Sequence, residues 1–273
     1  MPPTVAVPRL IATDLDGTFL LPDGSVSPEN SAAVLAAQAA GIPVLFATGR
    51  PVRWLDVIRD LPGGHPTVIA SNGAVLYDLG ASTVLDRICI DPEVALNAVR
   101  DIRAAIPAVS FAFESGTRFG HEPAYRIGRG VDGSDPALFS GLAEEIARNE
   151  DFVKMLVQHN DMAADDLMNR VVAVVEDAMT VTHSADRGRG LVEISAPGVS
   201  KASMLVRCCD RLGIDATEAA AFGDMPNDVA MLQWVGFPRV VANAHPYVLG
   251  LGYPVVPANV DSGVGRTIQE WLR

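Results

Sequence analysis

The sequence predicts an α/β fold, in which a Rossmann-like parallel-sheet core carries an inserted α+β domain. Short apolar segments alternate with helical segments near both ends of the chain, which is the pattern of a parallel sheet covered by helices. In the middle of the chain the strands follow one another more closely, as antiparallel strands do. These two observations place the core at residues 1–83 and 190–273 and the inserted domain at residues 84–189.

The first part of the core contains an apolar segment within residues 9–20, which predicts a buried strand. Ser27 followed by Pro28 begins a helix, because serine caps the helix and proline suits its first position. Gly41 ends this helix. We expect the remaining elements of this part to be a strand at residues 42–47, a helix from residue 51 to about 61 and a strand at residues 67–70.

The second part of the core begins with Ser200, which fits the cap of a helix that runs to Gly213. The elements expected after it are a strand at residues 218–223, a helix from residue 226 to about 235, and short strands at 239–242 and 253–256. In the middle of the chain, the inserted domain and the residues just after it, we expect strands at 84–90, 109–113, 152–158, 179–183 and 191–195. Its expected helices are at 91–105, 136–148 and 162–177, and residues 115–133 form a loop rich in Gly and Arg.

Two carboxylates, Asp14 and Asp16, follow the first apolar segment with one residue between them. Ligands of open α/β sheets bind at the carboxyl ends of the strands. Two neighbouring carboxylates repel each other, so the pair is favourable when a cation or a shared proton lies between them. The same residues also fit a simple turn, since Asp and Gly are common turn residues.

Three further segments argue against a simple turn. Thr48 follows the second predicted strand, and Lys201 lies in the first turn of a helix, where its charge opposes the helix dipole unless an anion lies nearby. Asp224 ends another predicted strand, with Asn227 and Asp228 on the turn that follows. Each segment also fits an ordinary loop or cap, but their combination beside strand and helix ends favours a single site.

These motifs resemble those of the haloacid dehalogenase superfamily, and within it the Cof-like phosphatases with a large α/β cap (type IIB). The matching segments are DLDGT at 14–18, ATGR at 47–50, SNGA at 71–74, GVSK at 198–201, GDMPND at 223–228, NAH at 243–245 and SGV at 262–264. The resemblance spans the whole chain, and it implies that the inserted domain is a cap that selects the substrate. Residues 84–189 match only in their pattern of elements.

The resemblance implies hydrolysis of a phosphate ester through an aspartyl-phosphate. Asp14 would be the nucleophile, and Asp16 would be the general acid and base. A divalent cation, Mg²⁺, would be held by Asp14, the backbone carbonyl of Asp16, and Asp224, because Mg²⁺ prefers hard oxygen ligands. The other residues with implied roles are Thr48, Gly49, Lys201 and Asn227 for the phosphate, and Asp228 for orienting metal-bound water or Lys201.

Several residues are weaker candidates for substrate contact: Arg50, Asn72, Arg118, Arg126 and Arg129. The arginines of the middle segment also fit solvated surface charges. Asn72 lies in the Ser71–Gly73 turn, which fits a purely structural role equally well.

Composition restricts the partners. With 21 Lys and Arg against 33 Asp and Glu, the net charge is −12, which argues against nucleic acid and anionic membranes as partners. Three cysteines and no signal-peptide pattern predict a cytoplasmic protein. The oligomeric state cannot be read from the sequence.

The leading functional hypothesis is a Mg-dependent phosphatase for small phosphorylated metabolites, such as a sugar phosphate. A phosphomutase of the same superfamily is one alternative, and a non-catalytic regulator that binds a phosphorylated metabolite is another. The intact acidic pair argues against the regulator, since a binding protein gains little from two repelling carboxylates.

Overall fold

The computed structural model describes residues 7–61, 66–127, 137–182 and 190–273. The chain divides into two compact units. The first, called the core, comprises residues 1–50, 54–86 and 200–273. The second, called the insert, comprises residues 51–53 and 87–199.

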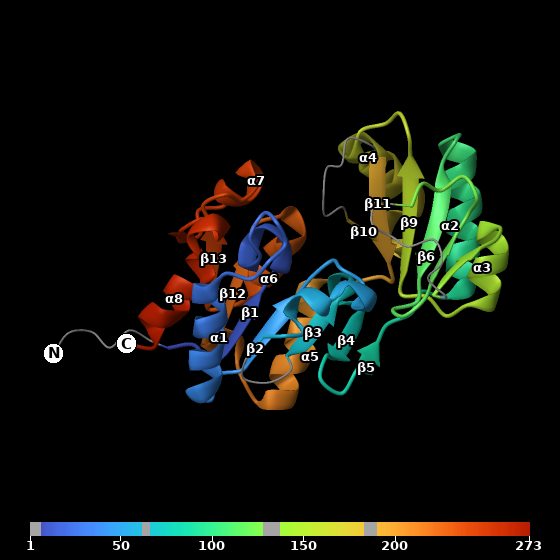
Figure 1. Ribbon diagram of the computed structural model, residues 1–273. Helices are drawn as coiled ribbons and strands as arrows, with labels where there is room; N and C mark the ends of the chain where they lie inside the picture. The colour runs from blue at the N-terminus through green and yellow to red at the C-terminus, as the bar shows by residue number, and fades with distance from the viewer. Residues whose placement is uncertain (1–6, 62–65, 128–136, 183–189) are drawn as a thin grey trace. The chain divides into compact units, whose positions relative to one another are not determined.

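The core contains an eight-stranded sheet in the order β14-β13-β12-β1-β2-β3-β4-β5 (Figure 1). The strands from β14 to β3 are parallel, and β4 runs antiparallel to β3. Their bounds are β1 Leu10–Thr13, β2 Val44–Ala47, β3 Thr67–Ala70, β4 Val75–Asp78, β5 Thr83–Arg87, β12 Ala219–Gly223, β13 Phe237–Val241 and β14 Val255–Val256. The predicted α/β fold with a parallel-sheet core is confirmed.

Helices cover both faces of the core sheet, and every residue of β1 and β12 is buried. Helix α1 packs against α8 on one face, and α5 packs against α6 and β3 on the other (Figure 1). Ser27 caps α1 as predicted, since its hydroxyl accepts a hydrogen bond from the Asn30 amide at 3.1 Å. The helices are α1 Pro28–Ala39, α5 Lys201–Leu212, α6 Val229–Trp234, α7 Pro246–Leu249 and α8 Gly263–Trp271.

The insert contains a six-stranded sheet in the order β10-β11-β9-β6-β7-β8, antiparallel except between β7 and β8. Helices α2 and α4 pack against each other, α3 packs against α2, and α4 packs on β11. The bounds are α2 Pro92–Ala105, α3 Ala143–Asn149, α4 Ala164–Val175, β6 Ser110–Glu114, β7 Phe119–His121, β8 Leu138–Ser140, β9 Lys154–His159, β10 Thr180–Thr182 and β11 Gly190–Ser195.

The predicted boundaries of the insert differ from those of the compact units. Strand β5 belongs to the core sheet, so the insert begins at the last residue of this strand, Arg87, and not at residue 84. Strand β11 pairs with β9 and β10, so the insert extends to residue 199 and not to residue 189. Strand pairing partners are set by tertiary contacts, which the local apolar pattern does not encode.

One predicted helix is wrong, and another is helical only in its second half. Residues 51–61 form two short 3₁₀ turns, Val52–Trp54 and Asp56–Ile58, separated by the fully buried Leu55. Of the predicted helix at 136–148, residue 136 lies outside the described residues. Residues 138–140 form β8 instead, because β8 pairs with β7, and the helix α3 begins at Ala143. Local helical spacing was outweighed in both places by tertiary packing.

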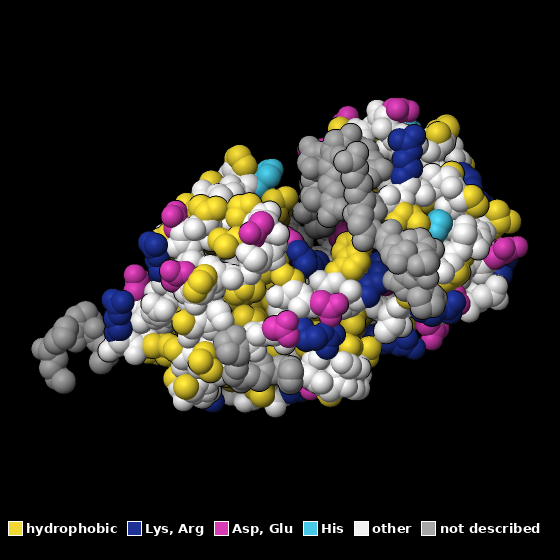
Figure 2. Space-filling model, viewed as in Figure 1, with side chains coloured by type: hydrophobic (Ala, Val, Ile, Leu, Met, Phe, Trp, Pro, Cys, Tyr) yellow, Lys and Arg dark blue, Asp and Glu magenta, His cyan; other side chains and the backbone are white. Residues whose placement is uncertain are grey.

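Positive and negative side chains alternate over the face of the molecule shown in Figure 2. Among the described residues, no helix is long and apolar enough to span a membrane.

Candidate active site

Asp14 lies directly after β1, at the carboxyl edge of the core sheet, and is 5 % exposed. The chain then turns sharply at Gly17, whose φ is +83°. A Cβ atom at Gly17 would lie 2.4 Å from the Asp224 carboxylate, so only glycine allows this approach. The turn therefore brings Asp224, at the end of β12, close to the loop that carries Asp14.

Three carboxylates meet at this edge: Asp14, Asp224 and Asp228. One oxygen of each lies within 4.8 Å of the others, and all three side chains are buried. Lys201, at the start of α5, is 1 % exposed and donates to Asp14 at 2.5 Å and to Asp228 at 2.6 Å. The cluster thus contains three acidic groups and one cation away from water.

Asp228 is held in place through both carboxylate oxygens. Its Oδ1 accepts from Lys201, while its Oδ2 accepts the backbone N–H groups of Asp224 and Met225 at 3.0 Å each. Because protein donors already occupy both oxygens, this arrangement suits the orienting role that the sequence suggests for Asp228 better than a role as metal ligand.

Burial is the main electrostatic influence on the cluster. It raises the pKa of Asp14 well above its usual range, against the opposing attraction of Lys201. Burial, reinforced by Asp228, raises the pKa of Asp224 to about 7. Burial alone would lower the pKa of Lys201, but Asp14 and Asp228 outweigh it and raise that pKa. An additional cation would relieve the excess negative charge.

The cluster fits a hard divalent cation by the chemistry of its donors. Two carboxylates, Asp14 and Asp224, remain available beside a lysine that neutralises only one charge. Thr18 orients Asp224 by donating to its Oδ1 at 2.8 Å. Oxygen donors of this kind are those that Mg²⁺ binds in proteins.

Asp16 is not a member of the buried cluster, and its side chain is 58 % exposed. Arg50 binds it through two contacts, from Nη2 to Oδ1 at 2.6 Å and from Nε to Oδ2 at 2.7 Å. Arg50 was predicted as a weak candidate for substrate contact. In the structure its guanidinium group binds the neighbouring acid.

The turns after β2 and β3 lie beside each other. Thr48 is buried, its Oγ1 accepts from the Arg50 amide at 3.1 Å, and its carbonyl accepts from the Asn72 amide at 2.9 Å. Gly49 lies between Thr48 and Arg50 in the same turn. Asn227 Nδ2 donates to Asn72 Oδ1 at 3.1 Å, which connects this turn to the loop after β12.

The Ser71–Gly73 turn contains three consecutive residues with positive φ, of 50°, 57° and 101°. A Cβ at Gly73 would lie 2.0 Å from the carbonyl oxygen of Ser200, the residue that caps α5. The close approach fixes the start of α5, which carries Lys201. This contact provides a structural reason for the turn.

The three arginines proposed for the insert differ in their surroundings. Arg118 donates to Glu150 at 2.6 Å and lies over the Phe139 ring at 4.5 Å. Arg126 has an exposed side chain. Arg129 lies outside the described residues.

Sequence reasoning missed one residue that supports the site and two ion pairs within the insert. Asn243 donates to the Gly17 carbonyl at 2.7 Å and so supports the turn after Asp14. In the insert, buried Lys154 pairs with Glu193 at 3.2 Å, and Arg53 pairs with buried Glu114. The NAH motif at 243–245 could have drawn attention to Asn243. The two ion pairs of the insert lie in no sequence motif that could have indicated them.

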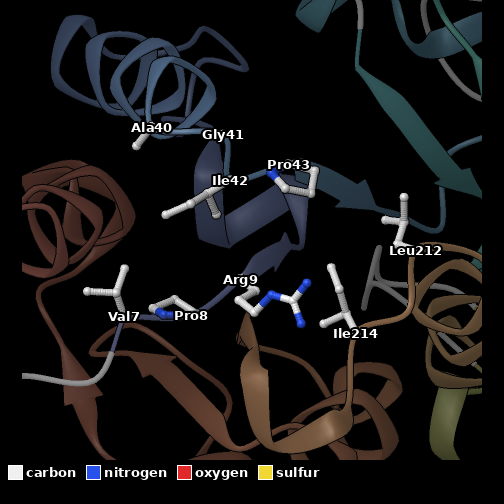
Figure 3. A pocket seen from close by; sticks show the side chains of 9 residues that line it. All are labelled: Val7, Pro8, Arg9, Ala40, Gly41, Ile42, Pro43, Leu212 and Ile214. Carbon is white, nitrogen blue, oxygen red and sulfur yellow. The ribbon is translucent and has the colours of Figure 1, made fainter.

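A hollow of about 430 Å³ lies at the opposite edge of the core sheet (Figure 3). Arg9 and Ile42 line it, and these residues come before β1 and β2, whereas Asp14 and Thr48 come after the same strands. Leu212 and Ile214 complete a mainly apolar wall. Its position separates this hollow from the acidic cluster.

The raised pKa of Asp224 predicts how metal binding depends on pH. A carboxyl whose pKa rises from 3.8 to about 7 on folding contributes stability that is complete below its unfolded pKa and is lost as pH rises through its folded pKa. A bound cation replaces the proton, so Mg²⁺ should raise the Tm more at about pH 8 than at about pH 5.5. Thermal denaturation with EDTA or Mg²⁺ at both pH values measures this. If Mg²⁺ raised the Tm of the Asp224→Asn variant by as much as that of the unchanged protein at both pH values, the prediction would be contradicted.

Comparisons with known proteins agree with the geometry. The family model for haloacid dehalogenase-like hydrolases matches residues 11–268. The chain is 24 % identical over 266 residues to the 5-amino-6-(5-phospho-D-ribitylamino)uracil phosphatase of Bacillus subtilis, covering 97 % of this chain and 96 % of that protein. It is 26 % identical over 272 residues to a protein of Streptococcus pyogenes named as a phosphatase, covering 97 % and 98 %.

Solved structures show the same fold. A phosphatase of this superfamily from Bacteroides thetaiotaomicron has a TM-score of 0.81 at 20 % identity, covering 99 % of this chain and 97 % of that one. A sugar phosphatase of subclass IIB has a TM-score of 0.77 at 19 % identity, covering 96 % and 98 %. The predicted family is therefore confirmed, and the chain belongs to the haloacid dehalogenase-like hydrolases.

Proposed function

We propose that the protein is a Mg-dependent phosphatase that hydrolyses small phosphorylated metabolites through an aspartyl-phosphate. The observation that carries this proposal is the position of Asp14, which is buried at the carboxyl edge of the sheet and bonded to Lys201. A carboxylate at this place can attack phosphorus, while the lysine provides positive charge for the phosphoryl oxygens.

In the first step, an oxygen of Asp14 forms a bond to phosphorus and the bond from phosphorus to the ester oxygen breaks. Asp16 gives its proton to the departing oxygen, which leaves as an alcohol. In the second step, Asp16 takes a proton from water as the water oxygen attacks phosphorus. The bond to Asp14 then breaks, and inorganic phosphate and the free carboxylate are restored.

The phosphoryl oxygens would be bound by Lys201 and by the turn that carries Thr48 and Gly49, with Asn227 as a further donor. Lys201 is fixed by Asp228, whose other oxygen is held by two backbone amides. This restraint keeps the lysine in position as charge shifts from Asp14 to the phosphoryl group.

Mg²⁺ would be held by Asp14, Asp224 and the backbone carbonyl of Asp16. When bound, it would neutralise phosphoryl charge and align the phosphorus with Asp14. The excess of buried carboxylates over cations supports this assignment.

The substrate class is a small phosphate monoester, such as a sugar phosphate or a phosphorylated sugar alcohol. Relatives named for a ribitylamino-uracil phosphate and for sugar phosphates support this proposal. We propose that the insert acts as the substrate-selecting cap, and we expect the cytoplasm as the compartment. Arg126 and Arg129 stay candidates for substrate contact.

A phosphomutase is the second candidate within the family. It would retain the phosphoryl group on Asp14 long enough to return it to a bound product. Thus a mutase would release little phosphate, and a metabolite-binding regulator would release none.

Phosphate release from a panel of phosphate monoesters tests the proposal. EDTA should reduce the rate to background, Mg²⁺ should restore it, and Ca²⁺ should substitute poorly because it favours higher coordination numbers and looser geometry. Isomerisation of a sugar phosphate without phosphate release would indicate the mutase. Full activity in EDTA would contradict the metal assignment.

A further inference from the structure

We infer that Arg50 is a positioning residue, which orients the Asp16 carboxylate toward the leaving group and away from the acidic cluster. This inference rests on the proposed function and adds a residue role to it. It begins from the two short contacts between Arg50 and Asp16, at 2.6 and 2.7 Å. Both nitrogen atoms bind different oxygens of one carboxylate, so the guanidinium group fixes the plane of the carboxylate as well as its position.

Arg50 is itself anchored by the turns around it. Its amide donates to Thr48 Oγ1 at 3.1 Å, and its carbonyl accepts from the Ser71 amide at 2.9 Å. Its third guanidinium nitrogen donates to the Trp54 carbonyl at 3.2 Å. The backbone of Arg50 and one nitrogen of its guanidinium group are therefore both fixed by contacts other than the one with Asp16.

The backbone places Asp16 outside the cluster. Asp16 has an extended conformation, with φ of −76° and ψ of 118°, and Gly17 follows it in the left-handed region. As a result Asp14 is buried while the Asp16 side chain is 58 % exposed. Two carboxylates two residues apart in sequence thus have separate surroundings, as different chemical roles require.

The Asp16 side chain is 58 % exposed and the Arg50 side chain is 23 % exposed, so solvent screens part of the attraction between their charges. The two-point contact adds a fixed orientation to that attraction. A lysine at this position could supply the positive charge, but it lacks the planar guanidinium group that binds both carboxylate oxygens at once (the planar fork).

Two esters with different leaving groups separate positioning from binding. p-Nitrophenyl phosphate has a good leaving group and needs little proton transfer, whereas an alkyl ester such as glycerol phosphate needs a well-placed acid. Arg50→Ala should lower kcat for glycerol phosphate at least about tenfold more than kcat for p-nitrophenyl phosphate, with little change in KM. Arg50→Lys should resemble Arg50→Ala, because the fork is lost in both.

Arg59→Ala is the matched control. Arg59 likewise binds one aspartate, Asp56, at 2.8 Å and a backbone carbonyl, that of Leu79, at 3.3 Å. Its removal should change neither kcat nor KM for either ester. Thermal denaturation of all three variants checks that they fold.

Each other outcome overturns the inference. A rise in KM for both esters in Arg50→Ala would make Arg50 a substrate-binding residue. An equal fall in kcat for both esters, or full rescue by Arg50→Lys, would exclude orientation by the fork. A wild-type protein that hydrolyses neither ester, nor any other monoester, would overturn the proposed function and this inference together.

Discussion

Replacing Asp14 with asparagine is expected to abolish phosphate release from every monoester. The amide cannot form the covalent phospho-enzyme, although it fills the same space at the end of β1. The fall in kcat should exceed about a hundredfold, which corresponds to ~3 kcal/mol of transition-state stabilisation. Initial rates of phosphate release, measured with saturating Mg²⁺, provide the test.

Asp16→Asn is the matched comparison for this variant, since it makes the same chemical change two residues away. It should slow the reaction but leave Asp14 able to be phosphorylated by esters with good leaving groups. Residual activity of more than about one hundredth in Asp14→Asn would contradict the nucleophile assignment, whatever Asp16→Asn does.

Replacing Lys201 with methionine is expected to affect both stability and catalysis. Lys201 is 1 % exposed and is bonded to Asp14 and Asp228. Its loss leaves two buried carboxylates without their cation, and removal of one partner from a buried pair costs about 3–5 kcal/mol. Urea denaturation in EDTA should show this loss in the free energy of unfolding, and phosphate release should fall to background.

A second substitution separates the electrostatic cause from lost packing. Adding Asp228→Asn to Lys201→Met removes one of the stranded charges, so the double variant should be more stable than Lys201→Met alone. It should remain inactive, because the phosphoryl group still lacks its lysine. If the second substitution destabilised the protein further by its full single-variant effect, the charge argument would be wrong.

The sequence predicted which side chains lie together at the sheet edge better than it predicted the parts of the chain around them. Asp14, Lys201 and Asp224 each follow or begin a regular element, and the carboxyl ends of parallel strands meet at one edge of a sheet. Their meeting therefore follows from the order of strands and helices. The buried position of all three side chains agrees with it.

The partners of Arg50 could not be predicted in the same way. The sequence showed an arginine after a strand end, but its contact with Asp16 depends on the turn at Gly17, which directs Asp16 away from Asp14. The exact boundaries of the insert could not be predicted for a related reason. Whether β5 and β11 join one sheet or the other is decided by pairing between residues distant in sequence.

The most direct test of the account is to identify the atom that receives the phosphoryl group. Protein mixed with a reactive phosphate ester and Mg²⁺ should be quenched in acid within a single turnover, digested and analysed by mass spectrometry. The account predicts one added phosphoryl group on the peptide that contains Asp14, and none when Asp14→Asn is treated alike. Hydrolysis at the full rate with no phosphorylated peptide, or with the group on another residue, would contradict it.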